Sequence, residues 1–191
     1  MTEDSYVLPA LDALGVDANL MERLASGDRD AVAGLYDRHA SRVFSLAHRI
    51  LRNGSDAEDV VQEVFSQAWR TAPSYRSSRG SVAAWLLMMA RTRAIDRLRT
   101  RRGTVSTDEG GVEQLPAAVP PPADDLIARE QGGRVRDAVS QLPPDQRRAL
   151  EMAYFDGMSQ SEIADALATP LGTIKTRIRT ALTTLRGRLR P

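Results

Sequence analysis

The chain contains no cysteine, which excludes disulfide bonds, thiol nucleophiles and cysteine-built zinc sites. Histidine is nearly absent too, because His39 and His48 are too few to build a histidine-based metal cluster. The longest apolar run, residues 82–90, is less than half of the roughly 20 residues that a transmembrane helix needs. The N-terminus has Glu3 and Asp4 but no basic flank followed by an apolar stretch, so no signal peptide is visible. We therefore expect a soluble cytoplasmic protein with no metal and no cofactor.

The chain as a whole also lacks an excess of charge of one sign, although its individual segments do not. The 191 residues hold 26 Lys and Arg against 25 Asp and Glu, a net charge of +1. This excludes a uniformly basic nucleic-acid coat and a uniformly acidic protein. Residues 1–105 carry a net +2, residues 106–130 a net −5 and residues 131–191 a net +4. Two basic parts are thus separated by an acidic spacer, a pattern that fits either solvated helix faces or nucleic-acid binding.

The composition along the chain indicates two small domains. Residues 103–125 are rich in Gly, Pro and acidic residues and have no apolar periodicity, which predicts a flexible acidic linker. The linker separates a first domain at residues 19–102, preceded by an N-terminal tail at 1–18, from a second domain at 126–191. Strand signals are almost absent from both. The predicted fold class is all-α, with two helical domains joined by the linker.

Two helices open the first domain. Asp28 is placed to cap a helix whose apolar residues recur at helical spacing until about Gly54. Ser55 and Glu58 have the spacing of a capping box, which predicts the start of the next helix. The apolar stripe of that helix leaves four polar residues turned outward, which are Asp59, Gln62, Glu63 and Gln67.

A loop and a long helix complete the first domain. Residues 72–80 contain Pro and several Ser, which favours a loop. Residues 81–102 are predicted to form a helix that begins apolar and ends as a basic rod, with three arginines at four-residue intervals along one face: Arg93, Arg97 and Arg101. The two tryptophans, Trp69 and Trp85, are expected in the core.

The second domain ends in a helix-turn-helix pattern. Helices are predicted over residues 127–142, 146–155, 159–168 and from 170 onward. Ser159 and Glu162 form a second capping box, and Thr169 is expected to cap the last helix, with Pro170 at its first position. A short helix, a tight turn and a second helix are the arrangement whose second helix enters the DNA major groove. An ordinary amphipathic terminal helix is the alternative.

Four segments of the chain resemble bacterial extracytoplasmic-function sigma factors, with a sequence most similar to the sigma-K-like branch. Residues 56–65, DAEDVVQEVF, resemble the helix of region two that binds core RNA polymerase. Residues 84–99, AWLLMMARTRAIDRLR, resemble the helix that recognises the promoter minus-ten element. Residues 156–164 and 170–181 resemble region four of the same family. The resemblance covers roughly residues 20–188, in the family's order.

The resemblance implies site residues of two kinds. Contacts to core polymerase are expected from Asp56, Asp59, Gln62 and Glu63. These carboxylates could instead favour the helix dipole, and Glu58 is read as a cap. Contacts to the minus-ten region and to a base flipped from the melted non-template strand are expected from Tyr75, Arg76, Arg79, Arg91, Arg93 and Arg97. Readout of the duplex minus-thirty-five element is expected from Lys175, Thr176, Arg177 and Arg179.

The resemblance therefore implies a promoter-specific transcription initiation factor that is not itself an enzyme. Its partners would be core RNA polymerase, promoter DNA as duplex and melted strand, and an anti-sigma factor, often anchored in the membrane. No direct membrane insertion is expected. The alternatives are a helix-turn-helix regulator that binds its operator alone as a dimer, and a helical enzyme. The enzyme lacks any convincing catalytic constellation in the sequence.

Overall fold

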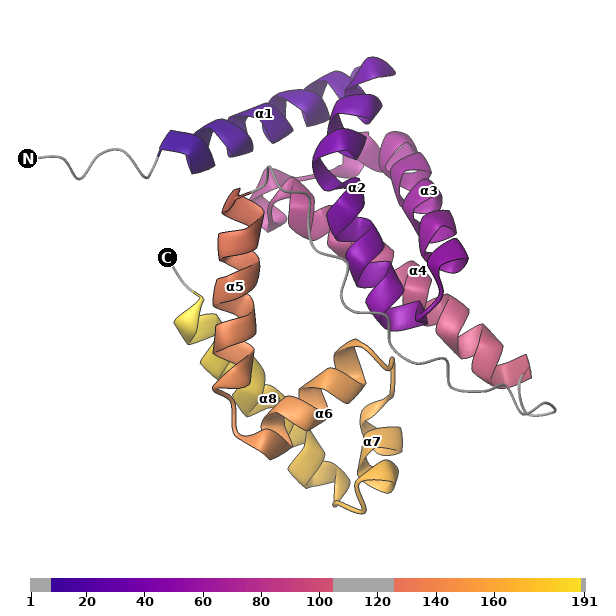
Figure 1. Cartoon of the computed structure of the whole chain (residues 1–191), viewed down its shortest axis with the longest axis vertical. Coiled ribbons are helices and arrows are strands. Elements are labelled where there is room, and N and C mark those ends of the chain that lie inside the picture. The colour runs from indigo at the N-terminus through magenta and orange to yellow at the C-terminus, as the bar shows by residue number, and fades with distance from the viewer. Residues whose placement is uncertain (1–7, 105–125, 190–191) are drawn as a thin grey trace, which may run out of the picture. The chain divides into compact units, whose positions relative to one another are not determined.

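The computed structural model describes residues 8–104 and 126–189, and the side chains of residues 15–102 and 132–189 (Figure 1). Within these ranges the chain forms helices and no strand, which confirms the all-α fold class. Two compact units are present, Met1–Pro122 and Ala123–Pro191. The predicted linker lies outside the described residues apart from its first two, which end a helix. Among the helices that can be described, none has the length and hydrophobicity that crossing a bilayer requires.

The first unit is a bundle of four α-helices. They are α1 (Leu8–Ala25), α2 (Asp30–Leu51), α3 (Gly54–Thr71) and α4 (Val82–Thr104), with short 3-10 turns η1 (Ala72–Ser74) and η2 (Ser77–Arg79) before α4. The core lies between α2, α3 and α4, where the most deeply buried large side chains are Leu35, Val43, Val60, Val64 and Leu86. Each such side chain contributes about 1.5–3 kcal/mol when it leaves water. This burial holds α3 and α4 side by side.

The start of α3 differs from the expectation. The predicted capping box of Ser55 and Glu58 is wrong, because the helix already begins at Gly54. Asn53 is the cap, since its side-chain oxygen accepts the Asp56 N–H at 2.9 Å. Ser55 and Glu58 are exposed within the first five residues of the helix. Asn is as good a cap as Ser, so the local sequence allows two helix starts that are two residues apart.

Helix α1 was not assigned from the sequence. It lies across the beginning of α2 (Figure 1), where the close approach is possible because a Cβ at Gly34 would stand 2.8 Å from Leu20 Cδ2. Asp17 of α1 is buried and accepts hydrogen bonds from two residues of α2, Arg38 Nε at 2.7 Å and His39 Nε2 at 3.0 Å. A buried ion pair therefore fixes α1 on the bundle.

The described residues of the second unit form four helices. They are α5 (Leu126–Ser140), α6 (Pro144–Tyr154), α7 (Gln160–Ala166) and α8 (Leu171–Arg188). The core between α6, α7 and α8 contains Ala149, Ile163, Ala164, Ile174 and Ile178. Helices α7 and α8 with the turn between them form the predicted helix-turn-helix.

The caps of these two helices were predicted with mixed success. Ser159 and Glu162 form the expected capping box, because each side chain binds the backbone N–H of the other. The prediction for Thr169 is wrong: its hydroxyl donates to the Leu167 carbonyl at 3.0 Å, and α8 follows Pro170 without a side-chain cap. The turn also holds Ala168 at φ 46°, a left-handed conformation that a non-glycine residue adopts only at a cost.

Candidate protein and nucleic-acid interfaces

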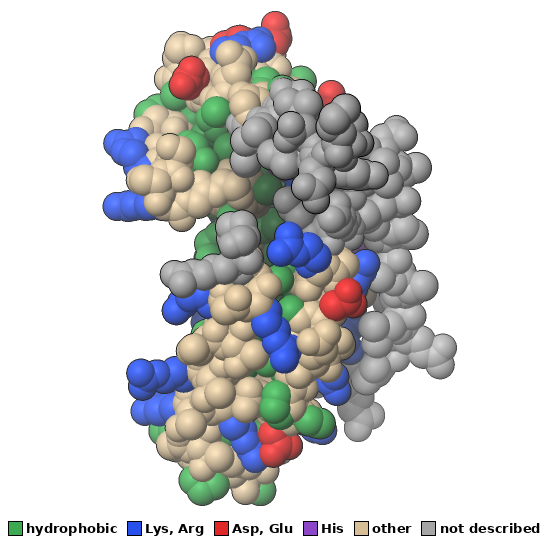
Figure 2. Space-filling model, turned by 90° about the vertical axis from the view of Figure 1, so that its left-hand side faces the viewer, with side chains coloured by type: hydrophobic (Ala, Val, Ile, Leu, Met, Phe, Trp, Pro, Cys, Tyr) green, Lys and Arg blue, Asp and Glu red, His purple; other side chains and the backbone are tan. Residues whose placement is uncertain are grey.

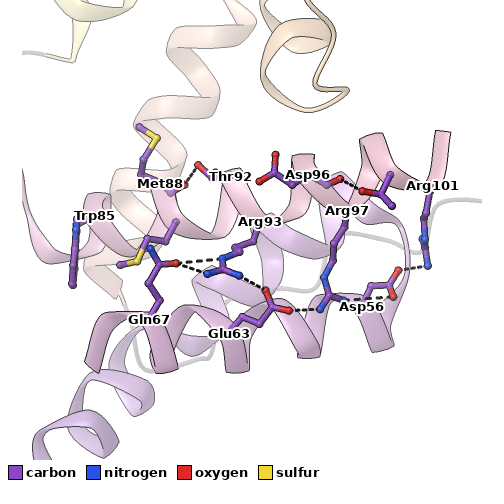
Figure 3. A pocket seen from close by; sticks show the side chains of 12 residues that line it. Asp56, Glu63, Gln67, Trp85, Met88, Thr92, Arg93, Asp96, Arg97 and Arg101 are labelled. Atoms are coloured by element: carbon purple, nitrogen blue, oxygen red, sulfur yellow. Dashed lines mark hydrogen bonds and ion pairs between the residues drawn. The ribbon is translucent and has the colours of Figure 1, made fainter. Parts of the chain in front are cut away.

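A groove of about 780 Å³ runs along α4, lined on one side by residues of α3 and extending over the side of α4 that faces away from α3 (Figure 3). One end is apolar and is lined by Trp85, Met88 and Met89, of which Met88 is 62% exposed. The other end is charged and is lined by carboxylates of α3 and guanidinium groups of α4. A surface that has both an exposed methionine and several charged side chains is suited to binding another macromolecule.

The charged end is a ladder of ion pairs, which we call the carboxylate ladder: Asp56, Asp59 and Glu63 of α3 with Arg93, Arg97 and Arg101 of α4. Arg97 is its centre, with Nη2 donating to Glu63 at 2.6 Å and Nη1 to Asp59 at 3.1 Å. On either side, Arg93 donates to Glu63 at 2.9 Å and Arg101 pairs with Asp56 (Figure 3). Because low numbers on α3 meet high numbers on α4, the two helices run antiparallel along the groove.

The ladder arises from matched helical spacing. Residues three or four apart share one face of a helix, so the arginines of α4 and the acids of α3 each form a row. Gln67 continues the α3 row and accepts from Arg93 Nη2 at 3.0 Å. The hydrogen bond from Arg97 lowers the pKa of the Glu63 carboxyl, partly opposed by burial, and the same bond raises the pKa of Arg97. Both partners therefore stay charged at neutral pH.

The predicted polymerase-binding residues all lie on this edge of α3, but they differ in how exposed they are. The Asp59 side chain is 55% exposed and Gln62 is exposed, so both face solvent as expected. Asp56 and Glu63 are half-buried, because they turn toward the arginines of α4. The structure thus brings the four residues together on one helix face and shows that three of them, Asp56, Asp59 and Glu63, already have cationic partners.

The predicted DNA-binding arginines of α4 separate into two groups. Arg93 and Arg97 point from α4 toward α3, whereas Met88, Thr92 and Asp96 point to the other side of α4 (Figure 3). Arg91 is partly exposed and lies about half a helical turn from Arg93. The sequence placed arginines on one face, but it did not reveal that this face turns to the acids of α3.

The loop before α4 presents the other candidate residues of the first unit. Tyr75 is half-buried, with its ring 5.3 Å from that of Trp85 and its hydroxyl donating to the Gly80 carbonyl at 2.9 Å. Burial, together with the negative charge of Asp17, raises the pKa of Tyr75. Arg76 and Arg79 are exposed, as expected of cations that contact a nucleic acid.

Both tryptophans are half-buried, so the expectation that they lie in the core is wrong. Trp85 lines the apolar end of the groove, and the Trp69 ring carries the Arg29 guanidinium 5.8 Å from its centroid. Trp is amphipathic and often stays at a surface that keeps one edge wet.

Helix α8 carries the candidate residues of the second unit. Ile174, Ile178 and Ala181 are buried, and Lys175, Thr176 and Arg179 are exposed. In the lower part of Figure 2, where α6, α7 and α8 lie, Lys and Arg side chains are more frequent than acidic ones. An exposed basic and hydroxyl-bearing face on the second helix of a helix-turn-helix can enter a major groove.

Arg177 differs from its neighbours on α8. Its Nη2 lies 2.5 Å from Oδ2 of Asp145, in the first turn of α6, and its side chain is only 25% exposed. The sequence analysis did not single out Asp145. No local signal could have identified it, because the two residues are 32 positions apart.

Comparison with known proteins assigns the two units to two parts of one family. Residues 35–104 match the family model for sigma-70 region 2, and residues 132–185 match that for sigma-70 region 4. The first match covers most of α2, α3 and α4, including the ladder. The second covers most of α5 to α8, including the helix-turn-helix.

Curated relatives agree with these matches. The chain is 39% identical over 169 residues to the ECF RNA polymerase sigma factor SigK of Mycobacterium ulcerans, across 88% of this chain and 90% of the relative. For SigK of Mycobacterium tuberculosis strain H37Rv the identity is 38% over the same coverage. Among solved structures, Rhodobacter sphaeroides SigE in complex with the anti-sigma ChrR is 31% identical, across 89% of this chain and 96% of that one, with a TM-score of 0.46.

Proposed function

The chain belongs to the extracytoplasmic-function sigma factors of the sigma-70 family, and we propose that it directs core RNA polymerase to a restricted set of promoters. The observation that carries this proposal is the presence of regions 2 and 4 in one chain, in that order, on two compact units. A factor of this kind holds promoter DNA at two places while the polymerase supplies the catalysis. The chain itself is then not an enzyme, and its place of action is the cytoplasm, where polymerase and DNA meet.

The first unit would bind the polymerase through the exposed edge of α3. Asp56, Asp59, Gln62 and Glu63 share this edge, and Asp59 and Gln62 are open to a partner. A basic surface on the polymerase would suit this edge, because it carries three carboxylates and the hydrogen bond from Arg97 lowers the pKa of the Glu63 carboxyl. Charge complementarity of this kind steers association and selects the partner.

The same unit would hold the melted strand near the minus-ten element. Tyr75 has an aromatic ring on which an extruded base can stack, and Arg76 and Arg79 are exposed beside it for phosphate contacts. Arg91, Arg93 and Arg97 of α4 complete the proposed set. Arg93 and Arg97 must share their donors with, or leave, the carboxylate ladder to reach DNA.

The second unit would read the minus-thirty-five element with α8. Lys175, Thr176 and Arg179 are exposed on one helix, with ammonium, methyl and guanidinium groups that match base edges and phosphates. Arg177 belongs to the proposed set but is drawn toward α6.

An anti-sigma factor is the remaining proposed partner. The resemblance to extracytoplasmic-function sigma factors implies such an inhibitor, often membrane-anchored, that covers the DNA-binding and polymerase-binding surfaces. The groove along α4, with the exposed Met88 at its apolar end, is a surface that an inhibitor could cover. Binding there would block access to the edge of α3.

Reconstitution with core polymerase tests the proposal. The purified chain is added to core enzyme, and promoter-dependent transcripts are measured on a panel of candidate promoters. Replacing Asp59 and Gln62 by Ala should weaken core binding, whereas replacing Lys175 and Arg179 by Ala should leave it intact and lower transcription about tenfold or more. Tight dimeric binding to DNA in the absence of polymerase, with no transcript on any promoter, would favour a conventional helix-turn-helix regulator instead.

A further inference from the structure

Arg177 occupies a flank of α8 and not its outward face. Successive residues of an α-helix are about 100° apart, so Thr176 and Arg179 lie away from the buried stripe of Ile174 and Ile178. Arg177 lies at the edge of that stripe on the side of α6, where its guanidinium group forms an ion pair with Asp145. The carboxylate partner of Arg177 is Asp145, at a distance of 2.5 Å between Arg177 Nη2 and Asp145 Oδ2.

The ion pair lies beside a polar hollow of about 260 Å³. The hollow is lined by Asp145 and Arg148 of α6, Leu167 and Thr169 of the turn region, and Arg177 of α8. Two guanidinium groups next to a recognition helix are the kind of groups that bind a DNA phosphate. Asp145 adds a negative charge at this place and engages one of the two guanidinium groups.

Stability does not account for the pair. The Asp145 side chain is 68% exposed, and ion pairs between exposed groups contribute little to folding. Its effect on DNA is larger, because nonspecific binding arises from cations that neutralise phosphates, and each cation removed lowers that affinity. A carboxylate near the DNA also repels phosphates.

We propose that Asp145 is a positioning residue that holds Arg177 away from DNA phosphates and thereby restricts nonspecific binding by α8. The outward residues Thr176 and Arg179 are untouched by this restraint, so base readout persists while sequence-independent attraction falls. The ratio of promoter binding to nonspecific binding is set in part by a residue outside the recognition helix. This inference rests on the proposed promoter-reading role of α8.

The test compares the full chain with its Asp145→Asn variant on a nonspecific duplex, by fluorescence anisotropy across a series of salt concentrations. Release of Arg177 to one more phosphate should steepen the slope of log K against log salt by about 0.9. At 0.1 M salt this corresponds to a gain in affinity of about five- to tenfold. Asp145→Glu restores the carboxylate and should return both quantities toward the original values.

Two controls separate positioning from a change in net charge. Asp137→Asn removes one exposed acid from α5 and should change the slope by much less than Asp145→Asn. In an Arg177→Ala background, Asp145→Asn should raise nonspecific affinity far less, because only the repulsion between the carboxylate and the phosphates is then removed. An unchanged slope in Asp145→Asn, or a gain of the same size without Arg177, would overturn the proposal.

Transcription by the reconstituted holoenzyme supplies the second readout. On a cognate promoter and on one with a scrambled minus-thirty-five element, Asp145→Asn should lower the ratio of transcripts by severalfold. A ratio that stays unchanged counts against the proposal. If no variant, including the parent chain, supports transcription, the proposed function fails, whereas the anisotropy result on nonspecific DNA still decides the role of Asp145.

Discussion

The buried carboxylate of Asp17 offers a sharp test of how α1 is held on the first unit. Asp17→Asn keeps the shape of the side chain but removes its charge and turns one acceptor into a donor. The acceptor that remains can satisfy either Arg38 Nε or His39 Nε2, which now lie at 2.7 Å and 3.0 Å from the two oxygens. The other donor loses its partner at a position where Asp17 and His39 are 7% and 3% exposed.

The expected loss follows from these contacts. Hydrogen bonds to a charged group contribute about 1.5–3 kcal/mol each, and breaking a buried ion pair costs about 3–5 kcal/mol. The Arg38 side chain is 34% exposed, so water can replace part of what it loses, which places the cost at about 2–3 kcal/mol. Asp28→Asn is the matched control, because Asp28 also pairs with an arginine but lies at the surface. We expect its effect to be much smaller.

Both tryptophans belong to the first unit, so urea unfolding followed by tryptophan fluorescence reports on that unit alone. Burial raises the pKa of Asp17, but hydrogen bonds from His39 and Arg38 outweigh it and leave the pKa below the ordinary value of about 3.9. The stabilisation by ionised Asp17 is therefore complete above about pH 4 and is lost as the pH falls through the lowered pKa. The gap between parent and variant should be constant near neutrality and shrink in acid. A variant within 0.5 kcal/mol of the parent at pH 7, with ~0.5 kcal/mol as the usual scatter of surface substitutions, would refute the assigned role of the pair.

Three further predictions concern the caps, the turn and the reading helix. Asn53→Ala should destabilise the first unit by about 1 kcal/mol in the same fluorescence assay, while Ser55→Ala should have little effect. Ala168→Gly should stabilise the second unit by about 1 kcal/mol, measured by calorimetry, because glycine accepts the positive φ without strain. The Thr176 hydroxyl donates to the Gly172 carbonyl at 3.0 Å, which leaves its methyl group to meet DNA. Thr176→Val should therefore keep promoter activity, whereas Thr176→Ser should lower it severalfold. A thymine-to-uracil exchange in the promoter should lower the activity of the parent chain but not that of the Ser variant. The reverse order of the Val and Ser variants would show that the hydroxyl is the reading group.

The elements of this fold could be predicted wherever their cause is local. The capping box of Ser159 and Glu162 lies within four residues, and the periodicity of α3 and α4 extends over whole helices. The same locality explains the error at α3, where Asn53 and Ser55 are both acceptable caps and only the fold selects one. Helix α1 was left unassigned because its anchor, Asp17, finds its partners 21 and 22 residues later.

The candidate sites show the same division at a larger scale. The rows of Arg93 with Arg97 and of Asp59 with Glu63 could each be read from their spacing, since each is a property of one helix. That the two rows pair with each other depends on how α3 and α4 pack, over separations of 30 to 38 residues. For this reason the sequence assigned the acids to the polymerase and the arginines to DNA without showing that they compete for one another.

The carboxylate ladder also bears on how hybrid initiation factors can be assembled. A recombinant that takes α4 from another factor and keeps α3 would leave Asp56, Asp59 and Glu63 facing residues that were never matched to them. Residues 54–104 are therefore the smallest segment whose exchange keeps the ladder matched, so an exchange of α4 brings with it the proposed polymerase-binding edge of α3. The second unit has its own core, so exchanging it as a whole carries no such requirement.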